Sequence, residues 1–123
     1  MPITAEAPRG GVIEYLSDAS HVFLLRMREI ERFEAKHRGI FEAWESFFGR
    51  GAKASSAEVR DLCALGLVGG GLKDHEADEL IAAQDPSALM HLYQIAQATL
   101  GVAFMPDVAA EDEPKKKDDL VDV

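Results

Sequence analysis

The residues that invite a chemical role lie around three consecutive glycines, Gly69 to Gly71, with Lys73 and Asp74 close behind. A glycine-rich loop that cradles phosphate follows a strand and continues into Lys and then Ser or Thr, whose hydroxyl holds magnesium. Here a helical pattern precedes the glycines, and an Asp that would repel phosphate stands where the hydroxyl is needed. We therefore expect no nucleotide site and no cofactor. The glycines (Gly69, Gly70 and Gly71) either join two helices passively or act as a hinge when a partner binds.

Histidine, cysteine and acidic residues do not predict a metal site or a nucleophile. The four histidines fall in four separate segments, without the paired spacing of zinc ligands. The acidic residues between 74 and 79 lack the ligand alternation and central glycine of a calcium loop. Cys63 lies on the apolar side of a predicted helix, which is typical of a small buried residue. We expect no catalytic residues, no bound metal and no enzymatic activity.

Composition and charge restrict the class of protein. The 123 residues are 47% hydrophobic and 28% charged, which is ordinary for one globular domain. A net charge of -9 argues against a nucleic-acid partner, which requires a concentrated basic surface. The sequence shows no membrane span and no secretory signal, and its single cysteine suits a reducing compartment. We expect a cytoplasmic protein that binds neither membranes nor nucleic acids.

Hydrophobic periodicity predicts a mostly helical α+β fold, in which an N-terminal β-hairpin packs on four to five short helices. The single domain is expected over residues 11–105, between a flexible arm at 1–10 and a disordered acidic tail at 106–123. β-branched and aromatic runs at 12–16 and 21–25 predict the hairpin, but their imperfect alternation leaves its buried face undecided.

Helical spacing begins at residue 27 and continues to residue 105. In the first helix Met27, Ile30 and Phe33 form a narrow apolar stripe among charged residues. Ser55 and Glu58 have the spacing of a capping box, which predicts the start of a third helix. Val59, Leu62, Cys63 and Leu67 give that helix its apolar side.

The last third of the domain predicts two more helices. A short acidic helix follows the glycines over residues 73–84. Asp85 then supplies an N-cap acceptor and Pro86 the first helical position of a new helix. Because its apolar residues keep helical spacing until Pro106, we expect this longest helix to be the centre of the core.

The second helix carries the densest aromatic stripe of the chain. Its aromatic residues recur with amphipathic spacing and are Phe41, Trp44, Phe47 and Phe48. Such residues are first of all core material, but a stripe of this density also suits a surface that binds another protein's helix. Both interpretations are open from the sequence.

The order of these elements resembles a known family, the tail assembly chaperones of long-tailed phages and gene transfer agents, whose members are also labelled tail tube proteins. The resemblance covers roughly residues 11–106. One departure lies in the hairpin turn, where Asp18-Ala19 replaces an expected Asp-Gly, so a different or longer turn is predicted. The segments that carry the resemblance are the hairpin, Ile30-Glu31-Arg32-Phe33-Glu34, the capped stretch 55–62, the stretch 66–71, and Leu92, Ala96, Leu100 and Ala103.

The resemblance implies a non-catalytic protein that binds the tape measure protein and tail tube subunits while a phage or gene transfer agent tail is built in the bacterial host. A small acidic protein with an aromatic helical surface could cover an amphipathic helix and keep it in solution. Two alternatives stay open: a structural tail component, such as a tube or minor tail protein, or a small protein-binding module without a phage connection. Self-association into a homo-oligomer is also open.

Overall fold

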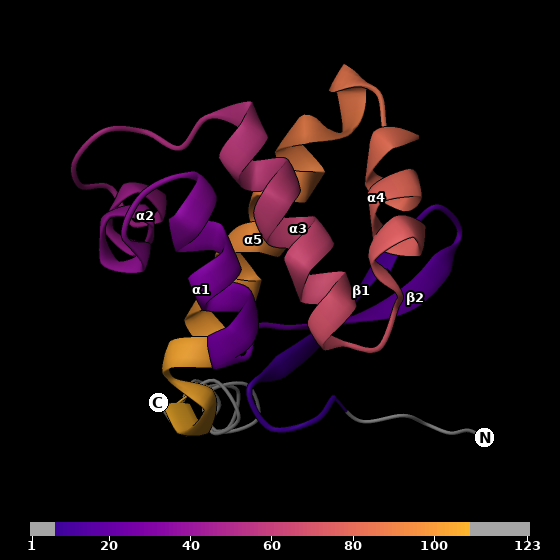
Figure 1. Cartoon of the computed structure of the whole chain (residues 1–123), viewed down its shortest axis with the longest axis horizontal. Coiled ribbons are helices and arrows are strands. Elements are labelled where there is room, and N and C mark those ends of the chain that lie inside the picture. The colour runs from indigo at the N-terminus through magenta and orange to yellow at the C-terminus, as the bar shows by residue number, and fades with distance from the viewer. Residues whose placement is uncertain (1–6, 109–123) are drawn as a thin grey trace, which may run out of the picture.

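The computed structural model describes residues 7–108, so most of the predicted arm at 1–10 and of the predicted tail at 106–123 lies outside the described residues. Within that range the chain is α+β and mostly helical, as predicted, with a two-stranded hairpin packed against the helices (Figure 1). The elements in chain order are β1 (Gly11–Leu16), β2 (Ala19–Leu24), α1 (Met27–Lys36), α2 (Ile40–Phe47), α3 (Ser56–Gly69), α4 (Asp74–Ala82), the 3-10 turn η1 (Pro86–Ala88) and α5 (Leu89–Phe104).

The hairpin turn is a tight turn of two residues. Leu16 and Ala19 are partners in the antiparallel ladder, so the turn consists of Ser17 and Asp18 alone. Both turn residues have positive φ, 54° and 65°, which matches the twist of a tight two-residue hairpin. Of the predicted alternatives, a different or a longer turn, the structure has the different one. Ala19 belongs to the strand, and the left-handed backbone falls on Ser17 and on Asp18, of which Asp is a residue type that tolerates it.

The core-facing side of the hairpin, which the sequence left undecided, carries Val12, Leu16 and Phe23. Phe23 is fully buried and Leu16 nearly so, and Val12 packs partly buried against the same core. β1 contacts α5, whereas β2 contacts α3. The two strands therefore lie against the two longest helices.

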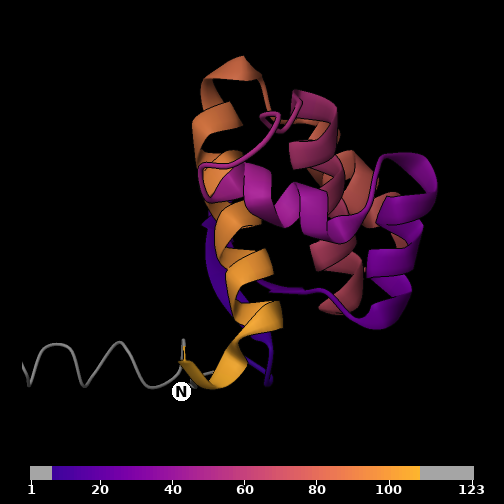
Figure 2. The ribbon, with the colours of Figure 1, turned by 90° about the vertical axis from the view of Figure 1, so that its left-hand side faces the viewer.

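α3 lies at the centre of the molecule, and α5, the helix that the sequence predicted as the centre, shares the core with it through contacts with α2, α3 and both strands. α3 contacts α1, α4, α5 and β2, and in Figure 1 it runs through the middle of the molecule between α1 and α4. Its predicted apolar residues (Val59, Leu62, Cys63 and Leu67) are all buried, together with Ala64, Leu65 and Gly66 on its other sides. α5 is the longest helix, as predicted, and Figure 2 shows it alongside α3 and in front of the hairpin. A helix that is apolar nearly all round is surrounded by other elements.

The capping signals in the sequence are confirmed. The Ser55 hydroxyl accepts from the Glu58 amide at 3.1 Å, and the Glu58 carboxylate accepts from the Ser55 amide at 2.9 Å. Asp85 caps η1 by accepting from the Ser87 amide at 3.0 Å, and α5 follows that single turn directly. These side chains satisfy amide groups that the first helical turn leaves unpaired.

The apolar stripe predicted for α1 was partly wrong. Met27 is 68% exposed, whereas Glu29, which the sequence placed among the charged residues, has no exposed surface. The Glu29 carboxylate accepts from the Arg26 amide and from Arg26 Nε, both at 2.9 Å, and from Arg26 Nη2 at 2.8 Å. Burial opposes ionisation of Glu29, but these hydrogen bonds outweigh it and hold the pKa of Glu29 below its usual value.

A second carboxylate is tied down in the same way at the start of α3. Glu58 is 8% exposed and accepts from Arg38 Nε at 2.7 Å as well as from the Ser55 amide. Burial again acts to raise the pKa of Glu58. The contacts with Ser55 and Arg38 act in the opposite direction and outweigh burial, so the pKa of Glu58 lies below its usual value. Both carboxylates are therefore ionised partners within the fold.

The glycine run forms a close contact between α3 and β2. Gly69 lies in the last turn of α3 and Gly70 is its C-cap. A Cβ at Gly69 would overlap the Leu24 carbonyl, and one at Gly70 would overlap the Val22 carbonyl. Gly71 follows with a φ of +123° and open space around it. The helix end thus rests directly on the strand backbone, while the hinge role of the three glycines stays a prediction.

Candidate protein-binding surface

α2 carries large apolar side chains on two sides, and one side is left open. Ile40 and Phe47 are only 4% and 2% exposed and belong to the core. Phe41 is 71% exposed and Phe48 45% exposed, and Trp44 is partly buried. The predicted stripe therefore divides: Phe47 serves the core, and the other three residues lie at the surface.

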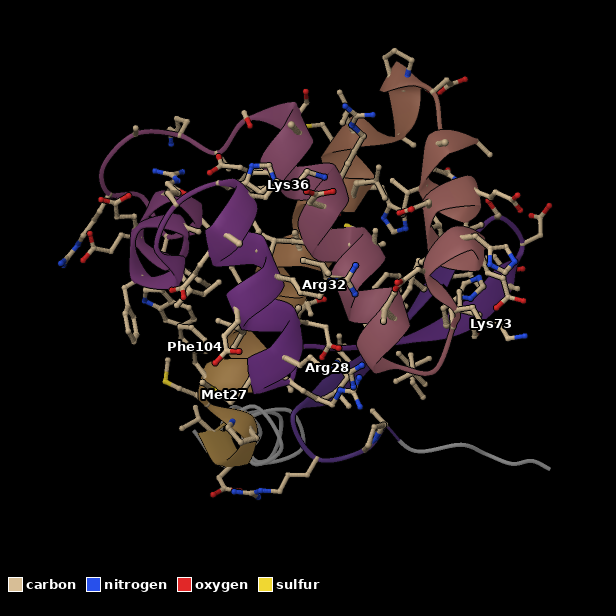
Figure 3. The ribbon with its side chains drawn as sticks, viewed as in Figure 1. Met27, Arg28, Arg32, Lys36, Lys73 and Phe104 are labelled. Atoms are coloured by element: carbon tan, nitrogen blue, oxygen red, sulfur yellow. The ribbon has the colours of Figure 1, made fainter. Side chains whose placement is uncertain are left out.

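Phe104, from the end of α5, joins these three residues. The ring centroids of Trp44 and Phe104 are 4.9 Å apart in a stacked arrangement, and those of Phe41 and Phe104 are 5.7 Å apart. Trp44 also contacts Phe48 at a centroid distance of 4.4 Å. We call these four residues (Phe41, Trp44, Phe48 and Phe104) the aromatic surface. Figure 3 labels Phe104 and shows that this part of the aromatic surface lies at the C-terminal end of α5.

Hydrogen bonds at both ends of α2 fix the aromatic surface in place. At the start, the Glu34 carboxylate accepts from the Ile40 amide at 2.9 Å, which joins α1 to α2. At the end, Gln97 Nε2 donates to the Phe47 carbonyl at 2.7 Å, which joins α2 to α5. Phe47 adds a ring contact to Tyr93 of α5 at a centroid distance of 4.9 Å. The helix that carries the rings is thus anchored to α1 and α5, which reduces the ordering that partner binding would require.

A shallow apolar groove of about 320 Å³ continues from the aromatic surface along α5. Its floor contains the small residues Ala98 and Gly101, and the Phe48 ring stands at its border with the aromatic surface. Met105 and Val108, which are 45% and 52% exposed, lie at its far end. Amphipathic helices bind with their apolar side chains in hydrophobic grooves. Exposed rings beside a groove lined by small residues suit that mode of binding.

Two exposed carboxylates accompany the rings on α2. Glu45 lies four residues after Phe41 and three before Phe48, so helical spacing places it on the same side of the helix. Glu42 is exposed one position beyond Phe41. An apolar partner with basic flanking residues therefore meets favourable charges at this surface.

The ionisable groups that the sequence raised as chemical candidates have structural contacts. His91 Nε2 donates to the Tyr15 carbonyl at 2.8 Å, His21 Nε2 to the Leu16 carbonyl at 3.1 Å, and His37 Nε2 lies 2.6 Å from Asp61 Oδ2. His75 is exposed. Within residues 7–108 no group of three or more His, Cys, Asp or Glu side chains could hold a metal ion.

Cys63 is a buried core residue, as the sequence indicated. Its thiol donates to the Leu92 carbonyl at 3.3 Å between α3 and α5, and burial raises its pKa to about 12. A thiol that stays protonated at neutral pH is a poor nucleophile and a poor metal ligand.

Within residues 7–108, no helix is long and apolar enough to cross a membrane. Comparisons with protein-family models, with curated proteins and with solved structures found no match to this chain. The resemblance to tail assembly chaperones is therefore a prediction that these comparisons do not test.

Sequence reasoning counted Phe104 among the apolar residues of the last helix and missed that this partly buried ring contacts Phe41 and Trp44 of α2. The available signal was its position, two residues before Pro106, where the helix leaves the core. Residues in the last turn of an amphipathic helix that extends past its neighbours are the first to become exposed.

Proposed function

We propose that this chain is a non-catalytic tail assembly chaperone of a phage or gene transfer agent, which holds an amphipathic helix of the tape measure protein on the aromatic surface. The observation that carries the proposal is the exposure of two rings of the aromatic surface, Phe41 at 71% and Phe48 at 45%, beside the partly buried Trp44 and Phe104. Soluble monomers rarely leave such residues in a contiguous group unless the group binds something. Binding through a helix with basic flanks agrees with Glu42 and Glu45 beside the rings.

The architecture also favours a chaperone over a tube subunit. A tube subunit should be built on a sheet that continues from one subunit to the next around a ring. The sheet within residues 7–108 has two strands, and most of the remaining elements are helices. Mass spectrometry of purified particles separates the two roles, because a chaperone should be absent from mature particles or nearly so, whereas a tube subunit should be among the most abundant proteins.

The direct test is co-expression with the tape measure protein encoded next to this chain, followed by pull-down. Phe41→Ala and Phe48→Ala remove exposed rings, so each variant should fold normally and recover much less tape measure protein. Met90→Ala is a matched control, because Met90 is 69% exposed and lies on α5 about 21 Å along the helix axis from Phe104. Full recovery by both phenylalanine variants would rule out the aromatic surface as the binding site.

A further inference from the structure

The register of the hairpin determines which backbone groups of β1 point away from β2. Leu16 and Ala19 close a two-residue turn, so this pair exchanges hydrogen bonds across the ladder. In an antiparallel ladder such pairs alternate with pairs that do not exchange hydrogen bonds. The N–H and C=O groups of residues 12, 14 and 16 therefore face β2, and those of residues 11, 13 and 15 point outward.

Contacts made by neighbouring groups agree with this alternation. The Gly11 amide donates outward to the Pro8 carbonyl, and the Tyr15 carbonyl accepts from His91 Nε2, each at 2.8 Å. On β2, the outward carbonyls of Val22 and Leu24 are the groups that lie against the end of α3. Four independent contacts thus assign the same residues to the outer edges.

The outer edge of β2 lies against another element, whereas the outer edge of β1 has unpaired backbone groups. The end of α3 closes the edge of β2. On β1, the N–H and C=O of Ile13, the C=O of Gly11 and the N–H of Tyr15 have no hydrogen-bond partner among residues 7–108. An edge strand with a row of unpaired donors and acceptors is a template for another strand.

A cleft lies beside this open edge. It has a volume of about 620 Å³, with residues 7–13 on one wall and Val102, Pro106 and Asp107 at the end of α5 on the other. An extended peptide between a strand edge and a helix gains main-chain hydrogen bonds from the strand and side-chain contacts from the helix. The cleft lies where such a peptide would pass Ile13.

We propose that the outer edge of β1 binds an extended segment of a partner protein as an added strand, seated in the cleft between β1 and α5. The four unpaired groups specify a peptide backbone as the occupant and fix a contact of about five residues. Every second side chain of an added strand points to the same side. Because Val102 and Pro106 give the cleft an apolar wall, the segment is expected to carry β-branched apolar residues at alternate positions. This site shares none of the four residues of the aromatic surface, although Val102 also lines the groove beside that surface, and the proposal does not depend on the function proposed above.

Amide hydrogen exchange of the full chain tests the proposal, with a blocked hexapeptide of alternating threonine and valine as the probe. In the free chain the amides of Val12 and Glu14 should be protected and those of Ile13 and Tyr15 should exchange rapidly. At a peptide concentration of about ten times Kd, exchange at Ile13 and Tyr15 should slow about tenfold, while Val12 and Glu14 change little. The same hexapeptide with every peptide nitrogen methylated should not produce this change, because neither of its edges then offers an N–H group.

A variant adds a second readout. Ile13→Pro removes an outward N–H without removing a β1–β2 hydrogen bond, so it should abolish peptide binding, whereas Ile13→Val should retain it. The exchange pattern of the wild-type chain decides the matter even if Ile13→Pro fails to fold. Three results would overturn the proposal. They are protection of the Ile13 and Tyr15 amides in the free chain, no binding of the peptide, or binding that leaves both amides unprotected.

Discussion

The contact of α3 with the hairpin and the contact of α2 with α5 use their residues in opposite ways. At the first, Gly69 and Gly70 bring a helix end onto a strand backbone, and a buried Glu29 is paired with Arg26 beside them. At the second, the exposed Phe41 ring and the partly buried Trp44 ring both contact Phe104. The first region leaves no room for an added atom, and the second leaves apolar area open to solvent. The difference indicates that the first region maintains the fold and that the second is available for a partner.

The largest loss of stability is expected from Phe47→Ala, which is compared with Phe41→Ala on the opposite side of α2. Phe47→Ala removes a buried ring and should lower the free energy of unfolding by about 3 to 5 kcal/mol. Phe41→Ala, at an exposed position of the same helix, should cost less than about 1 kcal/mol. Denaturant unfolding of both variants measures the contrast, and similar costs for the two would show that α2 does not have one buried and one open side.

The next largest effect tests the glycine contact. Gly69→Ala forces a Cβ into the Leu24 carbonyl, and because that neighbour is backbone, the cost should be about 3 kcal/mol. Gly39→Ala is the control, since nothing lies within 4 Å of its Cβ position, and it should cost less than about 1 kcal/mol. If Gly69→Ala is as stable as Gly39→Ala, the end of α3 is free to move and the hinge interpretation gains over a fixed contact. No change in nucleotide binding is expected in either case.

A smaller cost is expected for the buried carboxylate of α1. Glu29→Ala removes the acceptor of three hydrogen bonds from Arg26 and should cost about 2 kcal/mol. Glu31→Ala, two positions away on the exposed side of the helix, should change the free energy of unfolding by less than about 0.5 kcal/mol. Equal effects would mean that the hydrogen bonds between Glu29 and Arg26 do not stabilise the fold.

The smallest of these effects concerns pH. Because the pKa values of Glu29 and Glu58 are lowered in the folded chain, both residues contribute stability above the ordinary glutamate pKa of about 4.3. That stability is lost as pH falls through the lower folded values. The double variant E29Q/E58Q should therefore lose less stability than the wild type between neutral pH and about pH 3. Parallel curves of unfolding free energy against pH would contradict the assignment.

Local signals in the sequence were sufficient for much of the fold. The capping box at Ser55 and the N-cap at Asp85 depend on neighbouring residues only. The start of α3 was predicted correctly, whereas Asp85 caps the 3-10 turn η1, and α5 begins three residues later than predicted, at Leu89. The alternating and helical periods also identified the elements. The turn at Ser17 and Asp18 was missed because the expected glycine is absent and the residues that adopt positive φ lie one position earlier.

The features that sequence could not supply arise from contacts between distant segments. Nothing near Glu29 indicates that Gly69, forty residues later, will cover it together with the hairpin. Likewise, the spacing in α2 could not separate Phe47 from Phe41, because the division depends on which side of the helix α5 covers. Phe104 entered the aromatic surface for the same reason.

The most direct test of the partner surface uses Trp44, the only tryptophan of the chain. A tryptophan-free, amphipathic helical segment of the tape measure protein is titrated into the chain while Trp44 emission and acrylamide quenching are recorded. Binding on the aromatic surface predicts a blue shift and reduced quenching, and Phe41→Ala should weaken both without changing stability. A complex that forms while Trp44 emission and quenching stay as in the free chain would contradict the account.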